Sequence, residues 1–409
     1  MTNASSLSHR TPITAAMVRG AVEIDETPHG VLPHRLPAWA RSQWPDQQLS
    51  MAEEQPSGVR ICFETASTVI ELLALPTKRV YVGMPPSPDG IYDLVIDGAL
   101  ARQGSIANGN ILRIDVAKRA ADANSSAEMV PGVPGRLRFS DLPGGLKHVE
   151  IWLPHNEAAQ LVALYTDAPV KPAKASIRRL WLHHGSSISH GSNAVHPSGT
   201  WPAVAALQAG VDLLNLGLGG SALLDPFLAR MIRDQSADLI SLKLGINIVN
   251  MDLMRLRAFG PAVHGFLDTI REGHPATPLL LVSPILCPIH EDTPGPSAPD
   301  LSDGTLKFRA TGNANEVAVG KLTLAVIRDT LENIVAERRK DDPHIHYLNG
   351  RTLYGDHDHD RLPLPDRLHP NAASHRLIGE RFAEHAFGPQ APFHDRRAPQ
   401  AVSPSSRRD

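Results

Sequence analysis

The sequence predicts a two-part α/β protein, in which a small antiparallel β-sandwich domain precedes a three-layer α/β/α domain with a parallel sheet. Apolar and polar residues alternate between about residue 30 and residue 167. After Lys171-Pro172 this alternation gives way to short apolar runs separated by longer helical segments. Alternation is typical of antiparallel strands with one buried face, whereas unbroken apolar runs are typical of strands that helices cover on both faces.

The alternating part is predicted to form several short strands. Apolar side chains share one face in five segments, at residues 59–63, 70–74, 92–97, 112–116 and 149–153. Asn108-Gly109 predicts a tight hairpin turn, and Pro143-Gly144-Gly145 predicts a break between strands. Short strands with regular turns favour a β-sandwich.

The second part is predicted to alternate buried strands with helices. The apolar runs expected to form the parallel sheet are Leu180–Leu182, Val211–Leu216, Leu239–Leu244, Leu279–Val282 and Ile345–Leu348. Helices are expected over Arg255–Arg271, Lys321–Arg339 and about Ala372–Phe387, the last of them ended by Gly388-Pro389. Helices that join parallel strands form right-handed crossovers, which produces three layers.

These patterns divide the chain into four segments. We expect a disordered tail over residues 1–29, the β-sandwich domain over 30–170, the α/β/α domain over 176–388 and a second disordered tail over 389–409. The last segment is rich in Pro, Ser and Arg, a composition that does not form a hydrophobic core.

Composition narrows the class of protein. The net charge of −3 over 409 residues provides no basic field for nucleic acid or anionic lipid. The N-terminus has no basic start followed by an apolar run, and no stretch of about 18 apolar residues occurs, so we expect a cytoplasmic protein without a membrane partner. Cys62 and Cys287 could pair, but nothing requires a disulfide. The oligomeric state stays open.

Reactive residues are expected where parallel strands end, because active sites of open α/β sheets lie at the carboxyl ends of the strands. The first strand is followed by a segment from His183 to Gly191 that contains Ser187. A serine acts as a nucleophile only when its hydroxyl is exposed and close to a base. Gly185 and Gly191 permit a tight turn that could present Ser187. Taken alone, the segment fits an ordinary Ser/Gly loop better.

The second and third strands are followed by residues that could stabilise an oxyanion. Asn215 to Gly220 contains glycines, whose backbone N–H groups can approach a substrate closely. Asn247, in Leu244-Gly245-Ile246-Asn247, could donate a side-chain N–H to a developing negative charge. The competing interpretations are a flexible turn and a helix N-cap.

The fifth strand is followed by Asp366 and His369, three residues apart at the start of a predicted helix. This spacing can place the carboxylate beside one imidazole nitrogen and leave the other nitrogen to act as a base. The competing interpretation is a solvated loop before a helix capped by Asn371.

Together, the serine, the glycine turn, the asparagine and Asp-x-x-His occur in the order of the sequence blocks of the SGNH (GDSL-like) hydrolase family. The resemblance covers about residues 178–387, with Ser186 and Ile248 at positions where that family usually has aspartate. It implies an SGNH-hydrolase fold with a catalytic triad of Ser187, Asp366 and His369. It further implies an oxyanion hole formed by Ser187, Gly220 and Asn247.

The first part has a resemblance of its own. Gly90-Ile91-Tyr92-Asp93-Leu94 is similar to the GxDLY-type N-terminal β-domain that precedes some bacterial SGNH hydrolases, and residues 36–41 are similar to its start. Comparable two-domain layouts occur among carbohydrate esterases, so a carbohydrate ester is one expected substrate by analogy.

The resemblance implies a serine esterase that hydrolyses short-chain carboxylic esters through an acyl-enzyme, with a small-molecule or carbohydrate ester as partner and no cofactor or metal. One alternative is an acyltransferase with the same triad. Another is a carbohydrate-binding protein without catalysis, which is disfavoured because only 5% of residues are aromatic.

Two further segments have open interpretations. Residues 283–299 are rich in proline and could form a wall of an acyl pocket or a plain surface loop. Asp356-His357-Asp358-His359-Asp360 has side chains that bind divalent ions, but no flanking residues complete a ligand set. We therefore expect a solvated loop there rather than a metal site.

Overall fold

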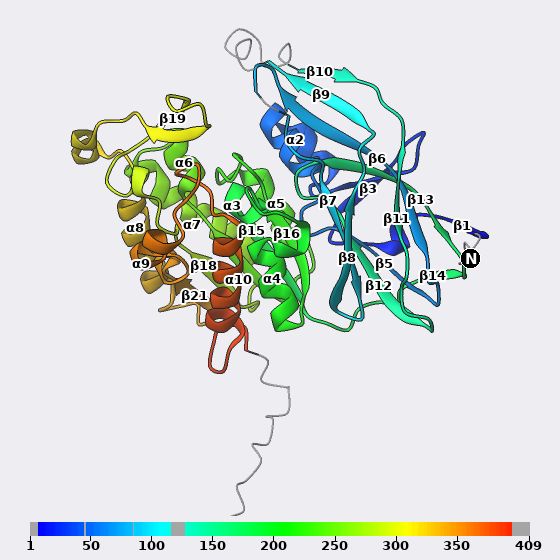
Figure 1. The fold of residues 1–409 in the computed structure, drawn as a ribbon. Coiled ribbons are helices and arrows are strands. Elements are labelled where there is room, and N and C mark those ends of the chain that lie inside the picture. Colours follow the sequence, from blue (N-terminus) through cyan, green and yellow to red (C-terminus); the bar gives the residue numbers. More distant parts are fainter. Residues whose placement is uncertain (1–6, 45, 85, 116–126, 395–409) are drawn as a thin grey trace, which may run out of the picture.

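A computed structural model describes residues 7–44, 46–84, 86–115 and 127–394. Figure 1 shows two parts side by side, a β-rich part from the first half of the chain and a layered α/β part from the second half. Among the described residues, no helix is long and apolar enough to cross a membrane.

The described residues of the β-rich part form an eight-stranded sheet and a six-stranded sheet. The strands of the first are β1 (His9–Pro12), β3 (Glu23–Glu26), β4 (Val31–His34), β6 (Ile70–Tyr81), β9 (Asn110–Ile114), β10 (Ala127–Val130), β11 (Gly135–Phe139) and β13 (Ala158–Thr166). The strands of the second are β2 (Val18–Arg19), β5 (Arg60–Thr65), β7 (Ile91–Ile96), β8 (Ala99–Ser105), β12 (Lys147–Trp152) and β14 (Val170–Pro172). Phe63 and Leu72 belong to different sheets and share one buried core, an arrangement compatible with the predicted β-sandwich.

The connections of this part differ from the prediction. Asn108-Gly109 does not form a hairpin, because β8 pairs with β7 in one sheet and β9 pairs with β6 and β10 in the other. The turn instead carries the chain between the two sheets. The β6–β9 pair is parallel, which is possible because a long connection rather than a tight turn joins the two strands. Two helices that were not predicted, α1 (Ala38–Gln43) and α2 (Gln47–Glu54), lie between β4 and β5.

The predicted N-terminal tail over residues 1–29 is wrong from residue 7 onward. β1 pairs with β13 over four residues, and Ile13 and Met17 are buried in the β-rich core. The apolar runs of this segment, such as residues 15–18, are too short to show the period of a strand or a helix. In the C-terminal tail predicted over 389–409, Phe393 is buried and its ring lies 5.4 Å from that of Phe387. The rest of that prediction, residues 395–409, lies outside the described residues, as do residues 1–6.

The α/β part is built on a five-stranded sheet, within the described residues, in which all neighbouring strands run parallel. In spatial order the strands are β16 (Asp212–Gly217), β15 (Leu180–Gly185), β17 (Leu239–Lys243), β18 (Leu279–Val282) and β21 (Ile345–Leu348). The α-helices are α3 (Ser187–His190), α4 (Trp201–Ala209), α5 (Pro226–Asp234), α6 (Ile246–Asn250), α7 (Leu256–Gly273), α8 (Leu324–Arg338), α9 (Asp356–Arg361) and α10 (Ala372–Phe387). The bounds of β18, β21 and α10 agree with the prediction.

Helices cover both faces of this sheet, as two neighbouring residues of β15 show. The His183 ring lies 4.7 Å from that of Trp201 in α4, whereas the His184 ring stacks on Phe266 of α7 at 6.1 Å. Successive side chains of a strand point to opposite faces, so α4 and α7 lie on opposite sides of the sheet. The part therefore has three layers, α/β/α.

Polar contacts and a shared hydrophobic cluster join the two parts. Arg60 of β5 is buried and donates to Asp212 Oδ1 of β16 at 2.7 Å. Asp93 of β7 accepts hydrogen bonds from His196 Nδ1 at 2.7 Å and Ser198 Oγ at 2.6 Å. The β-rich part thus fixes the segment that follows α3.

Replacing Met17 by alanine tests whether the N-terminal segment is part of the core. Met17 is 1% exposed, so Met17→Ala should lower the free energy of unfolding by about 2–5 kcal/mol, measured by urea denaturation. Met129→Ala is the matched control, because Met129 is 51% exposed. Equal stability of Met17→Ala and wild type would contradict the packing described here.

A buried carboxyl group predicts a pH dependence of stability. Glu157 is 3% exposed and accepts a hydrogen bond from the Gly90 amide at 2.8 Å, and burial raises its pKa from 4.5 to about 6. As the pH rises through this window, the unfolded chain loses the proton first, so the folded state loses roughly 2 kcal/mol of stability. Denaturation at pH 4.5 and pH 7 should show that Glu157→Gln removes this loss. An unchanged pH dependence in the variant would refute the assignment to Glu157.

Candidate active site

Ser187 lies at the point where β15 turns into α3. Ser186 caps the helix, since its Oγ accepts a hydrogen bond from the Ile188 amide at 3.4 Å. Gly185 permits the sharp turn, because a Cβ at this position would lie 2.3 Å from Ser189 Oγ. The turn leaves Ser187 half-buried at the carboxyl edge of the sheet.

His369 brings a base to Ser187 from 182 residues further along the chain. Its Nε2 lies 2.9 Å from Ser187 Oγ, and its Nδ1 lies 2.7 Å from Asp366 Oδ2. A carboxylate accepts a hydrogen bond, so the proton of the neutral ring is assigned to Nδ1. Nε2 is then available to accept the proton of the serine hydroxyl.

The carboxylate of Asp366 is held by four donors. The amides of Leu368 and His369 donate to Oδ1 at 2.9 and 2.7 Å, and Asn193 Nδ2 donates to Oδ2 at 3.2 Å, beside His369 Nδ1. Burial acts to raise the pKa of Asp366, but the hydrogen bonds and charge of His369 hold that pKa below its usual value. The group is therefore ionised at neutral pH and orients the His369 ring. The sequence around Asn193 held no signal for this contact.

The glycine turn after β16 lies against Ser187. A Cβ at Gly219 would be 3.7 Å from Ser187 Cβ, and Gly220 has a φ of 76°, in the region that favours glycine. Asn247 is buried in α6, and its Oδ1 accepts a hydrogen bond from the Ala222 amide at 3.2 Å. This bond commits the oxygen of the Asn247 side chain and leaves its NH₂ group as the donor for another partner.

The predicted site residues therefore lie together at one edge of the sheet. Ser187, Asp366 and His369 form one chain of hydrogen bonds. Gly220 belongs to the turn beside Ser187, and Asn247 is bonded to the segment that follows this turn.

A hairpin that the sequence analysis missed packs against His369. It consists of β19 (Ser297–Asp300) and β20 (Lys307–Ala310). The Phe308 and His369 rings are nearly perpendicular with 5.8 Å between centroids, and the Phe308 amide donates to the Asp366 carbonyl at 2.9 Å. The hairpin thus supports the loop that carries the base.

The proline-rich segment 283–299 contacts the same loop. Cys287 Sγ lies 3.5 Å from the Arg367 carbonyl, and Arg367 donates to Asp300 Oδ2 at 3.1 Å at the end of β19. Cys287 and Cys62 are both buried free thiols. A role of this segment in binding an acyl chain stays a prediction.

The histidines beside Ser187 in the sequence are buried polar groups of the sheet. His183 is bonded at both ring nitrogens, to Ser241 Oγ at 2.7 Å and Ser189 Oγ at 2.8 Å. His184 Nδ1 donates to the Leu216 carbonyl at 2.8 Å. Burial lowers the pKa of both rings, that of His184 to about 4, so both are neutral.

The predicted solvated loop at residues 356–360 is wrong, because Asp356–Arg361 form helix α9. Asp358 accepts a hydrogen bond from the Gly355 amide at 2.9 Å, which stabilises the first turn, and is paired with Arg381 at 2.6 Å. Over the ranges that the structure describes, no group of three or more His, Cys, Asp or Glu side chains is arranged to hold a metal ion.

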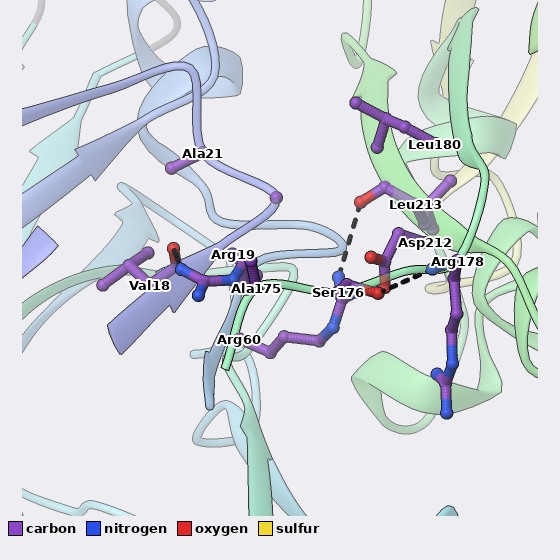
Figure 2. A pocket seen from close by; sticks show the side chains of 11 residues that line it. Val18, Arg19, Ala21, Arg60, Ala175, Ser176, Arg178, Leu180, Asp212 and Leu213 are labelled. Atoms are coloured by element: carbon purple, nitrogen blue, oxygen red, sulfur yellow. Dashed lines mark hydrogen bonds and ion pairs between the residues drawn. The ribbon is translucent and has the colours of Figure 1, made fainter. Parts of the chain in front are cut away.

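The cavity in Figure 2 lies at the other edge of the sheet. Its volume is about 340 Å³, and its lining includes Arg19, Arg60 and Asp212. Asp212 begins β16, whereas the candidate catalytic residues follow the ends of strands. This cavity between the two parts is therefore distinct from the candidate active site.

The comparisons with known proteins agree with this fold. Residues 180–287, within the α/β part, match the model of the GDSL-like lipase/acylhydrolase family, which confirms the predicted resemblance to it. The resemblance of Gly90–Leu94 to a GxDLY-type domain stays a prediction. A search of curated proteins found no match.

Solved structures extend the similarity over both parts. The salicylyl-acyltransferase SsfX3 from a tetracycline biosynthetic pathway is 29% identical, with 91% of this chain and 95% of that chain covered and a TM-score of 0.72. A protein from Bacteroides ovatus assigned to the GDSL-like lipases is 18% identical, with coverages of 91% and 96% and a TM-score of 0.64. A family two carbohydrate esterase from Cellvibrio japonicus is 12% identical, with coverages of 92% and 96% and a TM-score of 0.52.

Removing the Phe308 ring tests whether the hairpin holds the base in place. An aromatic pair contributes about 0.5–1.5 kcal/mol, so Phe308→Ala should slow the reaction of Ser187 with a fluorophosphonate roughly 2- to 13-fold. The backbone bond to Asp366 is kept in this variant. Arg309→Ala, on the exposed neighbouring position of β20, is the control. Equal labelling rates for both variants would show that the ring does not restrain His369.

Proposed function

We propose that the protein is a serine esterase that hydrolyses short-chain carboxylic esters through an acyl-enzyme on Ser187. The observation that carries this proposal is the hydrogen-bonded chain from Asp366 through His369 to Ser187 within a GDSL-like domain. Ionised Asp366 stabilises the imidazolium that forms when His369 accepts a proton, and this makes the serine hydroxyl nucleophilic.

In the proposed reaction, His369 Nε2 takes the proton of Ser187 as Oγ attacks the ester carbonyl carbon. The oxyanion receives hydrogen bonds from the amides of Ser187 and Gly220 and from the NH₂ group of Asn247. The Ser187 amide is suited to this role because the first amides of a helix have no partner within the helix. Collapse of the tetrahedral intermediate expels the alcohol, which takes its proton from His369. Water activated by His369 then releases the acid and restores Ser187.

Acyl transfer to an alcohol is the second candidate function. The 29% identity to SsfX3 over 91% of this chain supports it, since that protein is a salicylyl-acyltransferase. The acyl-enzyme would be the same, with a hydroxyl of an acceptor molecule in place of water. The carbohydrate esterases share the fold at 12–13% identity, so a sugar ester remains one substrate to test.

A panel of aryl and sugar esters tests the proposal. Wild type should hydrolyse at least one ester, Ser187→Ala should lose at least about 10³-fold in kcat, and Asn247→Ala about 10²–10³-fold. Ser187→Ala should keep the wild-type melting temperature, whereas Asn247→Ala, which leaves the buried Ala222 amide without its acceptor, should melt somewhat lower but stay folded at the assay temperature. Ser192→Ala, which removes a hydroxyl further along the chain, is the control. Full activity of Ser187→Ala would refute the assignment.

The same panel separates hydrolysis from acyl transfer. Each active ester is incubated with and without an added alcohol, and the free acid and the new ester are quantified by mass spectrometry. Free acid as the main product in the presence of the alcohol supports an esterase. A new ester as the main product identifies an acyltransferase.

A further inference from the structure

Two side chains of the β-rich part reach the glycine turn beside Ser187. Arg35, directly after β4, is fully buried and donates from Nη1 to the carbonyls of Asn215 at 3.0 Å and Gly217 at 2.7 Å. Gln48, in the first turn of α2, donates from Nε2 to the Gly219 carbonyl at 2.8 Å. Both contacts fall on the end of β16 and the turn that follows it.

The contact of Gln48 fixes the direction of one peptide group. The Gly219 carbonyl and the Gly220 amide belong to the same planar peptide, whose bond is trans, so they point in opposite directions. Because Gln48 holds the carbonyl oxygen, the Gly220 N–H is directed to the opposite side of the turn. This amide is the one to which the proposed mechanism assigns an oxyanion hydrogen bond.

The peptide that joins Gly219 to Gly220 has no side chain of its own to restrain it. Gly219 and Gly220 are adjacent glycines, and glycine has the largest conformational freedom of all residues. Gln48 fills the missing volume, since a Cβ at Gly220 would lie 3.2 Å from Gln48 Cγ. Packing and a hydrogen bond from one side chain therefore restrict the same peptide.

Arg35 supports the turn from the buried side. Its Nη2 lies 3.4 Å from His190 Nδ1, the atom that also accepts a hydrogen bond from the Gly219 amide at 3.3 Å. His190 Nε2 donates to the His155 carbonyl at 2.7 Å, so Nδ1 is the acceptor. Burial lowers the pKa of His190 well below its usual value, which keeps the ring neutral, and lowers that of Arg35 to about 9, which leaves it charged at neutral pH.

We infer that Gln48 is a positioning residue that directs the Gly220 amide toward the oxyanion. We also infer that Arg35 holds the end of β16, from which the same turn starts. This inference rests on the proposed function. The β-rich part then completes the reaction site of the α/β part, although it supplies none of the groups that react.

The test compares Gln48→Ala and Gln48→Glu with wild type. Loss of one oxyanion donor lowers kcat about 10²–10³-fold, whereas a misdirected donor still stabilises the oxyanion in part. We therefore expect kcat to fall about 10- to 100-fold, while KM changes less than about twofold. Gln48→Glu keeps the length of the side chain and removes the donor, so it should lose at least as much. Ser50→Ala, on an exposed position of α2, should behave as wild type.

A second readout separates positioning from a general structural role. A trifluoromethyl ketone with the acyl group of the best ester forms a tetrahedral adduct with Ser187, whose oxygen occupies the oxyanion site. Its Ki should rise by the same factor by which kcat/KM falls, with an unchanged pH profile and melting temperature. Arg35→Lys keeps the positive charge but replaces the two donor nitrogens Nη1 and Nη2 by one, so it should shift Ki in the same direction.

The outcomes distinguish the two proposals. An active wild type with an equally active Gln48→Ala, or an unchanged Ki, overturns the inference and leaves the esterase proposal intact. A change in KM alone makes Gln48 a substrate-binding residue and also overturns it. A wild type that is inactive on every ester, with or without an alcohol acceptor, overturns the proposed function.

Discussion

The candidate site depends on the parallel direction of the central strands. Because β15, β16 and β17 run the same way, the segments that follow them meet at one edge, and these segments carry Ser187, the glycine turn and Asn247. The sheet brings these segments to the same edge, but it does not determine the exact distances between their side chains. Local contacts do that: the cap at Ser186 orients Ser187, and Asp366 orients His369.

The β-rich part acts on this edge through buried polar groups rather than through a simple apolar contact. A fully buried guanidinium carries a large desolvation penalty, which the carbonyls of Ala52, Asn215 and Gly217 offset in part for Arg35. A hydrophobic side chain of similar size would pack there without this penalty. What such a side chain lacks is the ability to hold three backbone segments in one arrangement, which is consistent with a role in precise positioning.

The sequence predicted those parts of the fold and site whose signals are local. Unbroken apolar runs located β18 and β21, and the spacing of Asp366 and His369 pointed to the pair that the structure joins. Contacts between distant segments left no pattern to read, so Asn193, Phe308 and Gln48 were missed. A local signal gave a wrong prediction where pairing with distant strands determines the structure. Asn108-Gly109 links two sheets instead of closing a hairpin, because β8 and β9 pair with other strands.

The position of Arg35 in the chain has a consequence for biosynthesis. Two of its carbonyl partners lie 180 and 182 residues downstream, so they leave the ribosome long after Arg35 does. At about 5–20 residues per second, the delay is roughly 10–40 s. During that time the emerging N-terminal half carries a cation that can bond to the Ala52 carbonyl but not yet to Asn215 and Gly217, so the full burial of Arg35 requires synthesis of the second half of the chain.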